Sequence, residues 1–344
     1  MSDRFGRSKG DFRRAAGTFP AVPGPGAPAR QGRQIWVDGL LAPWEQATVH
    51  VLSHSLQRGS LVFDYMSVHA TPRGAGVFRL REHVERFLRS AELVGLPLGR
   101  GREELEAAIL ETVRANPGAK SVKLCAYLPS IEVDVVPMDE RVSVAIAAYD
   151  PKADVIDKSA GRPVAWRGAV RLFVEKQRRN RRNDILAPQA KVAANYTSPM
   201  AAKWAARRAG YDEIVLVDED GFVAETPTAN LFWVERGGAL RTPPAERVLL
   251  GVTRQSILEI AKHDGIDAAE ARIRPEELAK QAEVFLTGTT AGVLPVESID
   301  GAPVGDGKPG PLGQRLGARL REIQAGGDPA FAHWLAPAEP QGQG

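Results

Sequence analysis

The stretch from residue 184 to residue 234 constrains the fold of this chain more than any other. It begins with DILAPQAKVAANY, continues through a run rich in alanine, and ends with EIVLVDEDGFVAETPTANLFWV. Ser198 and Pro199 are typical of a helix start with proline at the first helical position. The pair Asp220-Gly221 lies between two apolar runs and predicts a β-hairpin. The stretch therefore predicts a helix followed by antiparallel strands.

The same stretch contains a lysine and a glutamate that could take part in catalysis. Lys191 lies among small and apolar residues, and a lysine shielded from water loses its charge more easily. A neutral lysine amine forms Schiff bases with carbonyl compounds. Glu225 follows the hairpin, and a carboxylate beside a pyridine nitrogen keeps that ring protonated as an electron sink. The two residues are a candidate pair for pyridoxal phosphate (PLP), although a lysine with small neighbours is more often an ordinary surface lysine.

Composition narrows the class of protein. The 344 residues are 43% hydrophobic and 25% charged, which is enough for two domains with real cores. A net charge of +3 gives no general preference for polyanions, so we expect no nucleic-acid partner. The single cysteine, Cys125, excludes an internal disulfide and suits a cytoplasmic protein. No apolar run reaches the roughly eighteen residues of a membrane span, and no secretory signal is apparent.

The order of sequence patterns predicts an α+β protein with two domains. The expected division is a disordered arm at 1–33, a small N-terminal α/β domain at 34–150, a connection at 151–160, a large domain at 161–326 and a flexible tail at 327–344. Predicted helices cover 84–94, 105–114, 199–209, 253–263 and 312–324. Predicted strands cover 34–44 around a turn, 61–70, 121–128, 142–149, 213–225 as a hairpin, 230–234, 239–242, 282–288 and 293–299. The basic run at 176–182 is interpreted as a solvated loop, because no aromatic residues are interleaved with its charges.

Four blocks carry a resemblance to a known family. AKVAANY, AETPTANLFWV, LLGVTRQSI and FLTGTTAGVLPV occur in order, and the similarity extends from about residue 35 to about residue 320. In these blocks the chain resembles the class IV (fold-type IV) PLP-dependent aminotransferases, in particular the branched-chain amino acid aminotransferases. The resemblance implies a small N-terminal domain, a larger barrel-like C-terminal domain and PLP between them. It also implies a homodimer in which loops of the partner close the pocket.

The resemblance also implies roles for individual residues. Lys191 would be the Schiff-base lysine and general base, Glu225 the partner of the pyridine nitrogen, and Tyr196 the donor to the phenolic oxygen. Val252 and Thr253 open a predicted helix whose free N–H groups would bind the phosphate. The remaining implied contacts are Leu249 against the ring, Thr289 and Arg86 on the phosphate, and Thr290 and Ala291 on the substrate carboxylate. Read alone, Arg86 would be an ordinary arginine on a helix surface.

The substrate side departs from the family pattern. Arg58 precedes Phe63-Asp64-Tyr65 where branched-chain enzymes carry a Phe-Glu-Gly sequence, and Lys123 replaces a family arginine. With Phe63, these two cations are the candidate substrate residues on this side. Arg58 could bind a carboxylate, or it could point away and pair with an acid such as Asp64.

The function predicted from these patterns is an aminotransferase. It would move an amino group from an amino acid, best a branched-chain L-amino acid, to 2-oxoglutarate by ping-pong chemistry through Lys191. The alternatives are a D-amino acid or (R)-amine aminotransferase, an aminodeoxychorismate-type PLP lyase, or a non-enzymatic binding module. We expect no metal site, because His50 and His54 have no acidic residue to complete one.

Overall fold

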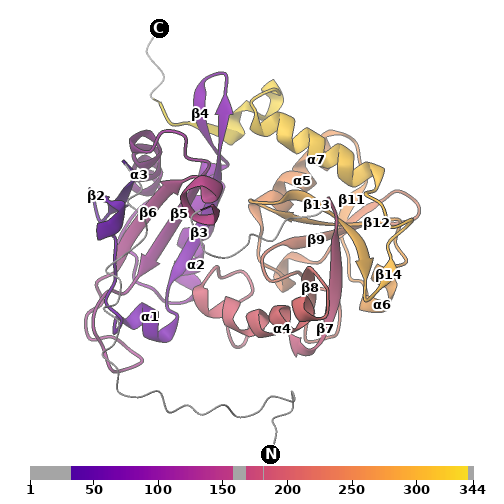
Figure 1. The fold of residues 1–344 in the computed structure, drawn as a ribbon, viewed down its shortest axis with the longest axis horizontal. Helices are drawn as coiled ribbons and strands as arrows, with labels where there is room; N and C mark the ends of the chain where they lie inside the picture. The colour runs from indigo at the N-terminus through magenta and orange to yellow at the C-terminus, as the bar shows by residue number, and fades with distance from the viewer. Residues whose placement is uncertain (1–31, 158–167, 181, 340–344) are drawn as a thin grey trace, which may run out of the picture.

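The chain forms two β-sheets that lie next to each other (Figure 1). The structure is a computed structural model, and it describes residues 32–157, 168–180 and 182–339. The first sheet has the order β15 (Leu335–Pro337), β4 (Gly74–Phe78), β3 (Val62–Thr71), β5 (Ser121–Tyr127), β6 (Ser143–Tyr149), β1 (Gln34–Val37) and β2 (Leu40–Pro43). The second sheet has the order β11 (Ala268–Glu270), β10 (Leu240–Thr242), β9 (Asn230–Val234), β12 (Glu283–Gly288), β13 (Gly292–Ile299), β7 (Val170–Arg179) and β8 (Glu213–Val217), with β14 (Ala302–Pro303) paired to β13. The expected α+β class is confirmed.

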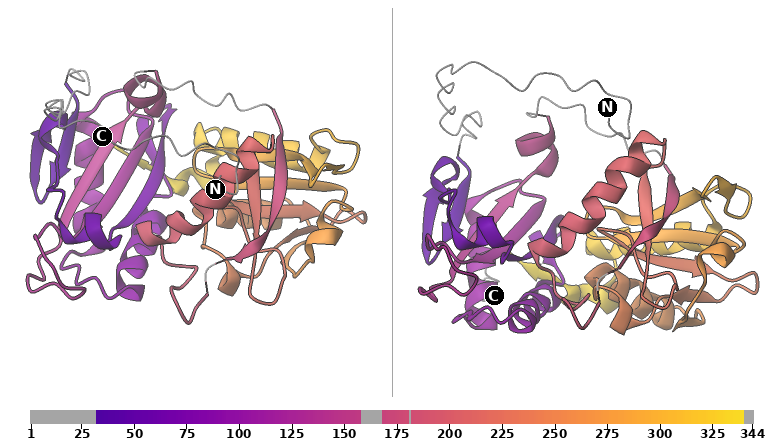
Figure 2. Two further views of the ribbon diagram at one scale, coloured as in Figure 1. Left: turned by 60° about the horizontal axis from the view of Figure 1, so that its bottom comes forward. Right: turned by 90° about the horizontal axis from the view of Figure 1, so that it is seen from below.

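Helices cover both sheets, and the two halves stay distinct in the other views of Figure 2. The α-helices are α1 (His54–Arg58), α2 (Leu80–Leu93), α3 (Arg102–Ala115), α4 (Thr197–Arg208), α5 (Val252–His263), α6 (Pro275–Leu278) and α7 (Pro311–Gln324). Short 3₁₀ turns are η1 (Trp44–Gln46), η3 (Ala193–Tyr196), η4 (Ala245–Arg247) and η5 (Pro329–Trp334), and η2 (Pro151–Ile156) is a π-helix. In the part of the chain described here, no helix is long and apolar enough to cross a membrane.

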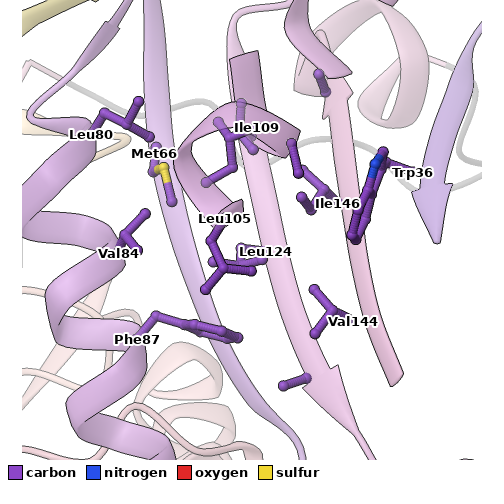
Figure 3. Packing of buried hydrophobic residues seen from close by; sticks show 14 of the residues in the cluster. Trp36, Met66, Leu80, Val84, Phe87, Leu105, Ile109, Leu124, Val144 and Ile146 are labelled. Atoms are coloured by element: carbon purple, nitrogen blue, oxygen red, sulfur yellow. The ribbon is translucent and has the colours of Figure 1, made fainter. Parts of the chain in front are cut away.

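The first sheet is antiparallel between all its neighbours and has one face covered by α2 and α3. Buried and half-buried residues alternate along β5 and β6 and at the start of β3, as expected for strands with one covered face. Figure 3 shows the core on that face, where Phe87 and Leu105 from the helices approach Met66 and Leu124 of the sheet. Burying each such side chain contributes about 1.5–3 kcal/mol, so this core fixes α2 against β3.

The second sheet curls until its ends meet. Val217 at the end of β8 forms a bridge with Val223, and Val223 N donates to Ile273 O at 2.9 Å. Ala271, next to that segment, donates to Thr242 O of β10 at 2.9 Å. These bonds connect one end of the sheet to the other, which gives the barrel-like arrangement that the resemblance implies.

The expected flexible tail is wrong for the residues that the structure describes. After α7 the chain forms η5 and then β15, which pairs antiparallel with β4 of the first sheet. Phe331, Trp334 and Leu335 are buried against the core of the second half. Their burial offsets the entropy of ordering the segment, which local sequence alone does not reveal. Residues 340–344 of the expected tail, and 1–31 of the expected arm, lie outside the described residues.

Other boundaries also differ from expectation. The basic run is not a loop up to Arg179, because β7 continues through it with residues 176–179 exposed, and residue 181 is outside the described part. Lys176 pairs there with Asp300 at 3.2 Å. Part of the expected connection at 151–160 is the π-helix η2, capped by the Asp150 carboxylate, and residues 158–160 are not described. The helix predicted to begin at residue 199 begins at Thr197, directly after η3.

Candidate active site

A cavity of about 470 Å³ lies between the two halves of the molecule. The first half contributes residues from β3 and α2, and the second contributes residues from η3, α5, β12 and the loops beside them. The lining includes the expected cofactor residues Arg86, Lys191, Tyr196, Glu225, Leu249, Val252, Thr253 and Thr289, and the expected substrate residues Phe63, Thr290 and Ala291. Residues more than two hundred positions apart in the chain are therefore brought to one enclosed space.

The backbone of Lys191 is fixed by the first half of the molecule. Phe63 N of β3 donates to Lys191 O at 3.0 Å, and Lys191 N donates to Ser90 Oγ of α2 at 3.0 Å. The small buried neighbours Ala190 and Val192 allow this close approach to β3. Lys191 Nζ then reaches the cavity, where it lies 3.0 Å from Tyr196 Oη and 4.8 Å from the centroid of the Phe63 ring. The amine is thus held between two aromatic side chains.

Glu225 presents a buried carboxylate to the same cavity. Its side chain is 3% exposed, and its oxygens accept hydrogen bonds from Leu249 N at 3.2 and 3.3 Å. Asn230 Nδ2 donates to Glu225 Oε2 at 3.2 Å and to Leu249 O at 2.8 Å. A carboxylate buried with donors on its oxygens is suited to a cationic N–H partner, such as a protonated pyridine nitrogen. Sequence reasoning assigned no role to Asn230, whose only signal was a polar residue opening an apolar strand.

The N-terminus of α5 forms another wall. Gly251 is the N-cap, and Val252 and Thr253 follow as the first helical residues, with free N–H groups that favour an anion. A Cβ at Gly251 would collide with the side-chain oxygen of Asn230, so a larger residue here would displace that side chain. Thr287 Oγ1, also in the lining, is buried without a hydrogen-bond partner in the described part of the chain. These donors fit a phosphate at this end of the cavity.

Arg86 is directed toward this end by a buried cluster. Arg86 Nε and Nη2 lie 2.8 Å from the two oxygens of Asp64, and Arg86 Nη1 donates to Leu250 O at 3.2 Å. His83 Nδ1 is 2.7 Å from Asp64 Oδ1. Burial alone would raise the pKa of Asp64, but the charge of Arg86 and the contact with His83 hold it well below its usual range. Burial lowers the pKa of His83, which favours the neutral ring.

The expected pairing of Arg58 with Asp64 is wrong. Arg58 is exposed at the end of α1, and its Nη2 donates to Val133 O at 2.7 Å. Asp64 lies on the face of β3 that packs on α2, so its carboxylate points to Arg86 instead. The alternative of Arg58 as a clamp inside the cavity also disagrees with the structure, because Arg58 is not part of the lining. It does point away, as the second alternative supposed.

The substrate side carries two further polar groups. Lys123 is not in the cavity lining, but its Nζ lies 4.4 Å from the ring centroid of Phe63, which is a lining residue. Tyr65 lines the cavity two residues after Phe63, and sequence reasoning noted it only as a departure from a family glycine. Burial and the neighbouring Tyr65 phenol raise the pKa of Tyr149. This side is therefore aromatic and polar.

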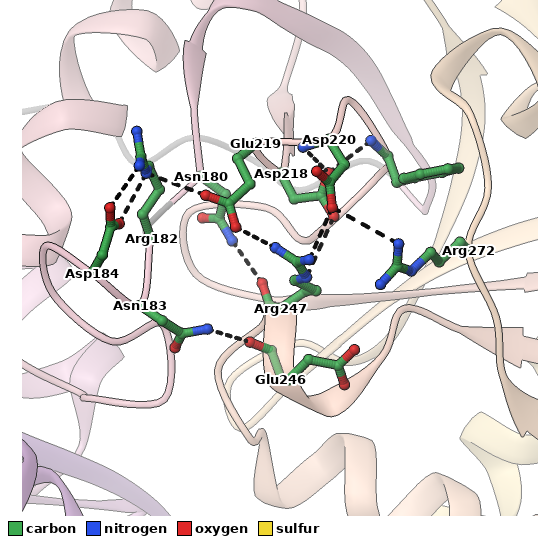
Figure 4. Close-up of polar contacts among 11 residues, drawn as sticks. Asn180, Arg182, Asn183, Asp184, Asp218, Glu219, Asp220, Glu246, Arg247 and Arg272 are labelled. Carbon is green, nitrogen blue, oxygen red and sulfur yellow. Dashed lines mark hydrogen bonds and ion pairs between the residues drawn. The ribbon is translucent and has the colours of Figure 1, made fainter.

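A polar network connects three segments that lead to cavity residues (Figure 4). Arg247 donates to Glu219 at 2.5 Å and to Asp220 at 2.9 Å, and Arg182 lies 3.2 Å from Glu219. Asn180 Nδ2 donates to Arg247 O at 3.0 Å. Glu219 and Asp220 lie at the hairpin turn, and Arg247 lies in η4. Asn180 and Arg182 follow the end of β7. We name the four charged residues, Arg182, Glu219, Asp220 and Arg247, the surface network.

The surface network matters because each of its segments leads to a cavity residue. Residues 180–190 lead to Lys191, the hairpin at 218–221 leads to Glu225, and η4 leads to Leu249. Further bonds join the first and third segments, from Asn183 to Glu246 O and from Gln189 to Ala245 O. The relative positions of the lysine and the carboxylate therefore depend on loops that are tied to one another outside the cavity.

The histidine and the cysteine that the sequence also offered lie in surroundings that indicate a structural role. His54 is buried at the start of α1, with Nδ1 2.9 Å from Ser60 Oγ and Nε2 2.8 Å from Val135 O. Across residues 32–157, 168–180 and 182–339, no group of three His, Cys, Asp or Glu side chains is placed to hold a metal ion. Burial raises the pKa of Cys125 to about 11, so this thiol is unreactive near neutral pH.

Known proteins share this fold and sequence. The branched-chain-amino-acid aminotransferase of Escherichia coli (strain K12) is 34% identical over 285 residues, covering 82% of this chain and 90% of the relative. The Pseudomonas aeruginosa enzyme of the same name is 31% identical over 301 residues, covering 87% and 95%. A crystal structure of Thermobaculum terrenum branched-chain amino acid aminotransferase in its PLP form has a TM-score of 0.79 and 26% identity, covering 90% of this chain and 99% of that chain. A branched-chain aminotransferase from Thermoproteus uzoniensis with norvaline has a TM-score of 0.80 and 34% identity, covering 89% and 99%.

A family description matches as well. The model for amino-transferase class IV covers residues 61–299, from the start of β3 to the end of β13. This range contains every cavity residue described above. On this match and on the relatives of more than 30% identity over most of the chain, the protein belongs to the class IV aminotransferase family.

Proposed function

We propose that this protein is a PLP-dependent aminotransferase that moves the amino group of a branched-chain L-amino acid to 2-oxoglutarate. The observation that carries the proposal is one cavity in which the Lys191 amine, the buried Glu225 carboxylate and the N-terminus of α5 share the lining. These are the amine, the ring-nitrogen partner and the anion site that PLP requires. The relatives named for branched-chain amino acids support the substrate class.

The proposed roles depend on where each group lies. Val252, Thr253, Thr289 and Arg86 would hold the phosphate, and Leu249 would pack against the ring. Glu225 would accept a hydrogen bond from the protonated ring nitrogen, and bound PLP would then supply an electron sink for negative charge at the substrate Cα. Tyr196, 3.0 Å from Lys191 Nζ, would hydrogen-bond the phenolic oxygen.

Lys191 would act as the general base. Its amine would form the covalent link to the cofactor, be released by the incoming amino acid, and then remove the proton from the substrate Cα. The first half-reaction would consume one water, release an oxo acid and leave the amino group on the bound cofactor. In the second half, 2-oxoglutarate accepts that amino group and departs as glutamate, which is the ping-pong sequence. The turn at Thr290 and Ala291 would orient the substrate carboxylate through backbone N–H groups.

We also propose that the protein is a cytoplasmic homodimer. Exposed apolar side chains gather on α1, the loop before it and the loop between β5 and β6, namely Val49, Val51, Leu52, Leu56, Ile131, Val133, Val135, Val136 and Met138. Val133 and Met138 are 92% and 90% exposed. The two loops contact each other through the bridge between Ser53 and Ile131. A contiguous apolar surface of this kind supports an interface with a second copy, and light scattering on Val133→Glu would show a monomer.

The decisive experiment follows the absorbance of bound cofactor during single turnovers. Purified protein should show a visible absorbance band that Lys191→Ala removes, while Lys280→Ala, which removes an exposed lysine paired with Glu277, leaves the band intact. Branched-chain L-amino acids should convert the band without 2-oxoglutarate, and adding 2-oxoglutarate should restore it. Conversion by D-amino acids would point to the D-specific alternative, and release of pyruvate without an acceptor would point to the lyase. No band at all would refute the proposal.

A further inference from the structure

Side chains of helix α2 contact α5 and the residue before it at two points, one of which lies at the cofactor cavity. At the cavity end, Arg86 Nη1 of α2 donates to Leu250 O, just before α5 begins. At the other end, Arg79, the N-cap of α2, pairs with Glu259 of α5. Seven residues separate the two arginines, which is two helical turns or about 10 Å along the axis. Because Arg79 lies before Arg86 while Glu259 lies after Leu250, the helices run in opposite directions.

Arg79 is held from several sides. Its Nη1 and Nη2 lie 3.0 Å from the two oxygens of Glu259, a bidentate ion pair, and its Nε donates to Glu82 Oε1 at 2.7 Å. Its guanidinium carbon lies 4.3 Å from the centroid of the Trp334 ring. Arg79 itself is 4% exposed, so its guanidinium is largely shielded from water, although Glu82 and Glu259 are partly exposed.

The backbone of Arg79 is also unusual. Its φ of 50° places its backbone in the left-handed region, which residues other than glycine rarely adopt. Arg79 N donates to Trp334 O at 2.6 Å, so the C-terminal segment stabilises this conformation. A strained residue that is fixed by so many contacts indicates a position whose geometry matters.

The C-terminal segment packs against Arg79. Figure 1 shows it leaving α7, drawn in yellow, and crossing from the second sheet to the edge of the first. Trp334 is buried and lies edge-on to Phe78 of β4, with ring centroids 5.8 Å apart. The segment that sequence patterns suggested to be a flexible tail therefore covers Arg79.

We infer that Arg79 is a positioning residue for the anion end of the cavity. Locked to Glu259 and covered by Trp334, it fixes α2 against α5 so that Arg86 stays beside the free N–H groups at the start of α5. The inference rests on the proposed function for the identity of the anion, the phosphate of PLP. It concerns binding of that phosphate and not the chemistry at Lys191.

The test compares ligands that differ only in the phosphate. Apoenzyme is titrated with pyridoxal phosphate and with pyridoxal, and the two dissociation constants are measured by absorbance. Glu259→Gln keeps the size of the side chain but removes its charge, and Glu259 is partly exposed, so the variant should fold. We expect its affinity for pyridoxal phosphate to fall about three- to tenfold, with its affinity for pyridoxal unchanged. Arg79→Lys, which cannot form the bidentate pair, should show the same selective loss.

Glu92→Gln is the matched control, because Glu92 pairs with Arg89 on the exposed side of α2. It should leave both dissociation constants at the wild-type values. An unchanged affinity for pyridoxal phosphate in Glu259→Gln would overturn the inference, and so would an equal loss for both ligands, which would show general loosening of the fold.

A separate arm distinguishes failure of the inference from failure of the proposed function. Inorganic phosphate is titrated into wild-type apoenzyme and into Glu259→Gln by calorimetry. Weaker phosphate binding in the variant supports the inference even if pyridoxal phosphate proves not to be the cofactor. Equal phosphate binding by both proteins, or none by the wild type, would overturn it.

Discussion

Two groups of ionic contacts support the cavity, and they differ in their access to water. In the buried cluster of Asp64, His83 and Arg86, the Asp64 side chain is 0% exposed. In the surface network, the Arg247 side chain is 19% exposed and its partner Glu219 is 38% exposed. Water can replace a lost partner in the second group but not in the first. Losing an ionic contact at the anion end should therefore cost much stability. Losing one around the loops that carry the lysine and glutamate should cost little.

Removing the acid of the buried cluster should have the largest effect. Asp64→Ala leaves the guanidinium of Arg86, which is 10% exposed, without its carboxylate partner, and we expect this to lower the free energy of unfolding by about 3–5 kcal/mol. Urea denaturation of apoenzyme measures this loss. Asp184→Ala, which removes an exposed partner of Arg182, is the control and should change it little. A loss below about 1 kcal/mol for Asp64→Ala would mean that the buried cluster behaves like the surface network.

The buried cluster should also give the protein a distinctive pH dependence. The pKa of His83 in the folded state is lowered from its ordinary value of 6.5, so below that pH the unfolded chain binds a proton that the folded chain resists. Stability should therefore fall as the pH falls below 6.5, by up to about 1.4 kcal/mol per pH unit for one proton. The lowered pKa of Asp64 adds a second loss as the pH falls below 3.8.

His83→Gln tests this assignment, because glutamine does not titrate. Urea midpoints measured between pH 7 and pH 5 should become flatter in the variant than in the wild type. Replacing the exposed His333 in the same way should leave the wild-type slope. If His83→Gln keeps the full slope, another group is responsible and the buried cluster does not set the pH response.

The contrast also explains what the sequence could and could not predict about the site. Lys191, Glu225 and the glycine that opens α5 belong to local blocks whose chemistry is visible in the letters. The partner of Asp64 could not be predicted from the sequence, because proximity in the chain suggested Arg58. The alternation of β3 gives the reason: Asp64 shares the helix-facing side with Val62 and Met66 and so must point at α2.

The C-terminal segment shows a second limit. Its glycine, proline and alanine content resembles that of a loose tail, and the helices and strands before it were mostly predictable from period and turn residues. Phe331 and Trp334 become ordered only because α5, α7 and Phe78 of β4 offer them a buried site. That site is built from residues far away in the chain, so no local pattern contains it.

Within the surface network, a single substitution should have a smaller effect. Arg247→Ala removes contacts to Glu219 and Asp220, and we expect a loss of about 1 kcal/mol because both acids remain hydrated. The loss should shrink further in high salt, which screens exposed pairs. Arg247→Lys is the matched control and should recover part of the stability. Urea denaturation at low and high salt decides, and a salt-independent loss of several kcal/mol would place Arg247 with the buried cluster.

The smallest expected effect is the coupling within the surface network. Arg182 and Arg247 share the Glu219 carboxylate, at 3.2 and 2.5 Å, so the first substitution changes what the second can lose. A double-mutant cycle of Arg182→Ala and Arg247→Ala should give a coupling energy of about 0.5 kcal/mol. The pair Arg102→Ala and Arg247→Ala has no acid in common and should be additive. If the first pair is also additive, Glu219 does not connect the segment that leads to Lys191 with the segment that leads to Leu249, and each loop is held independently.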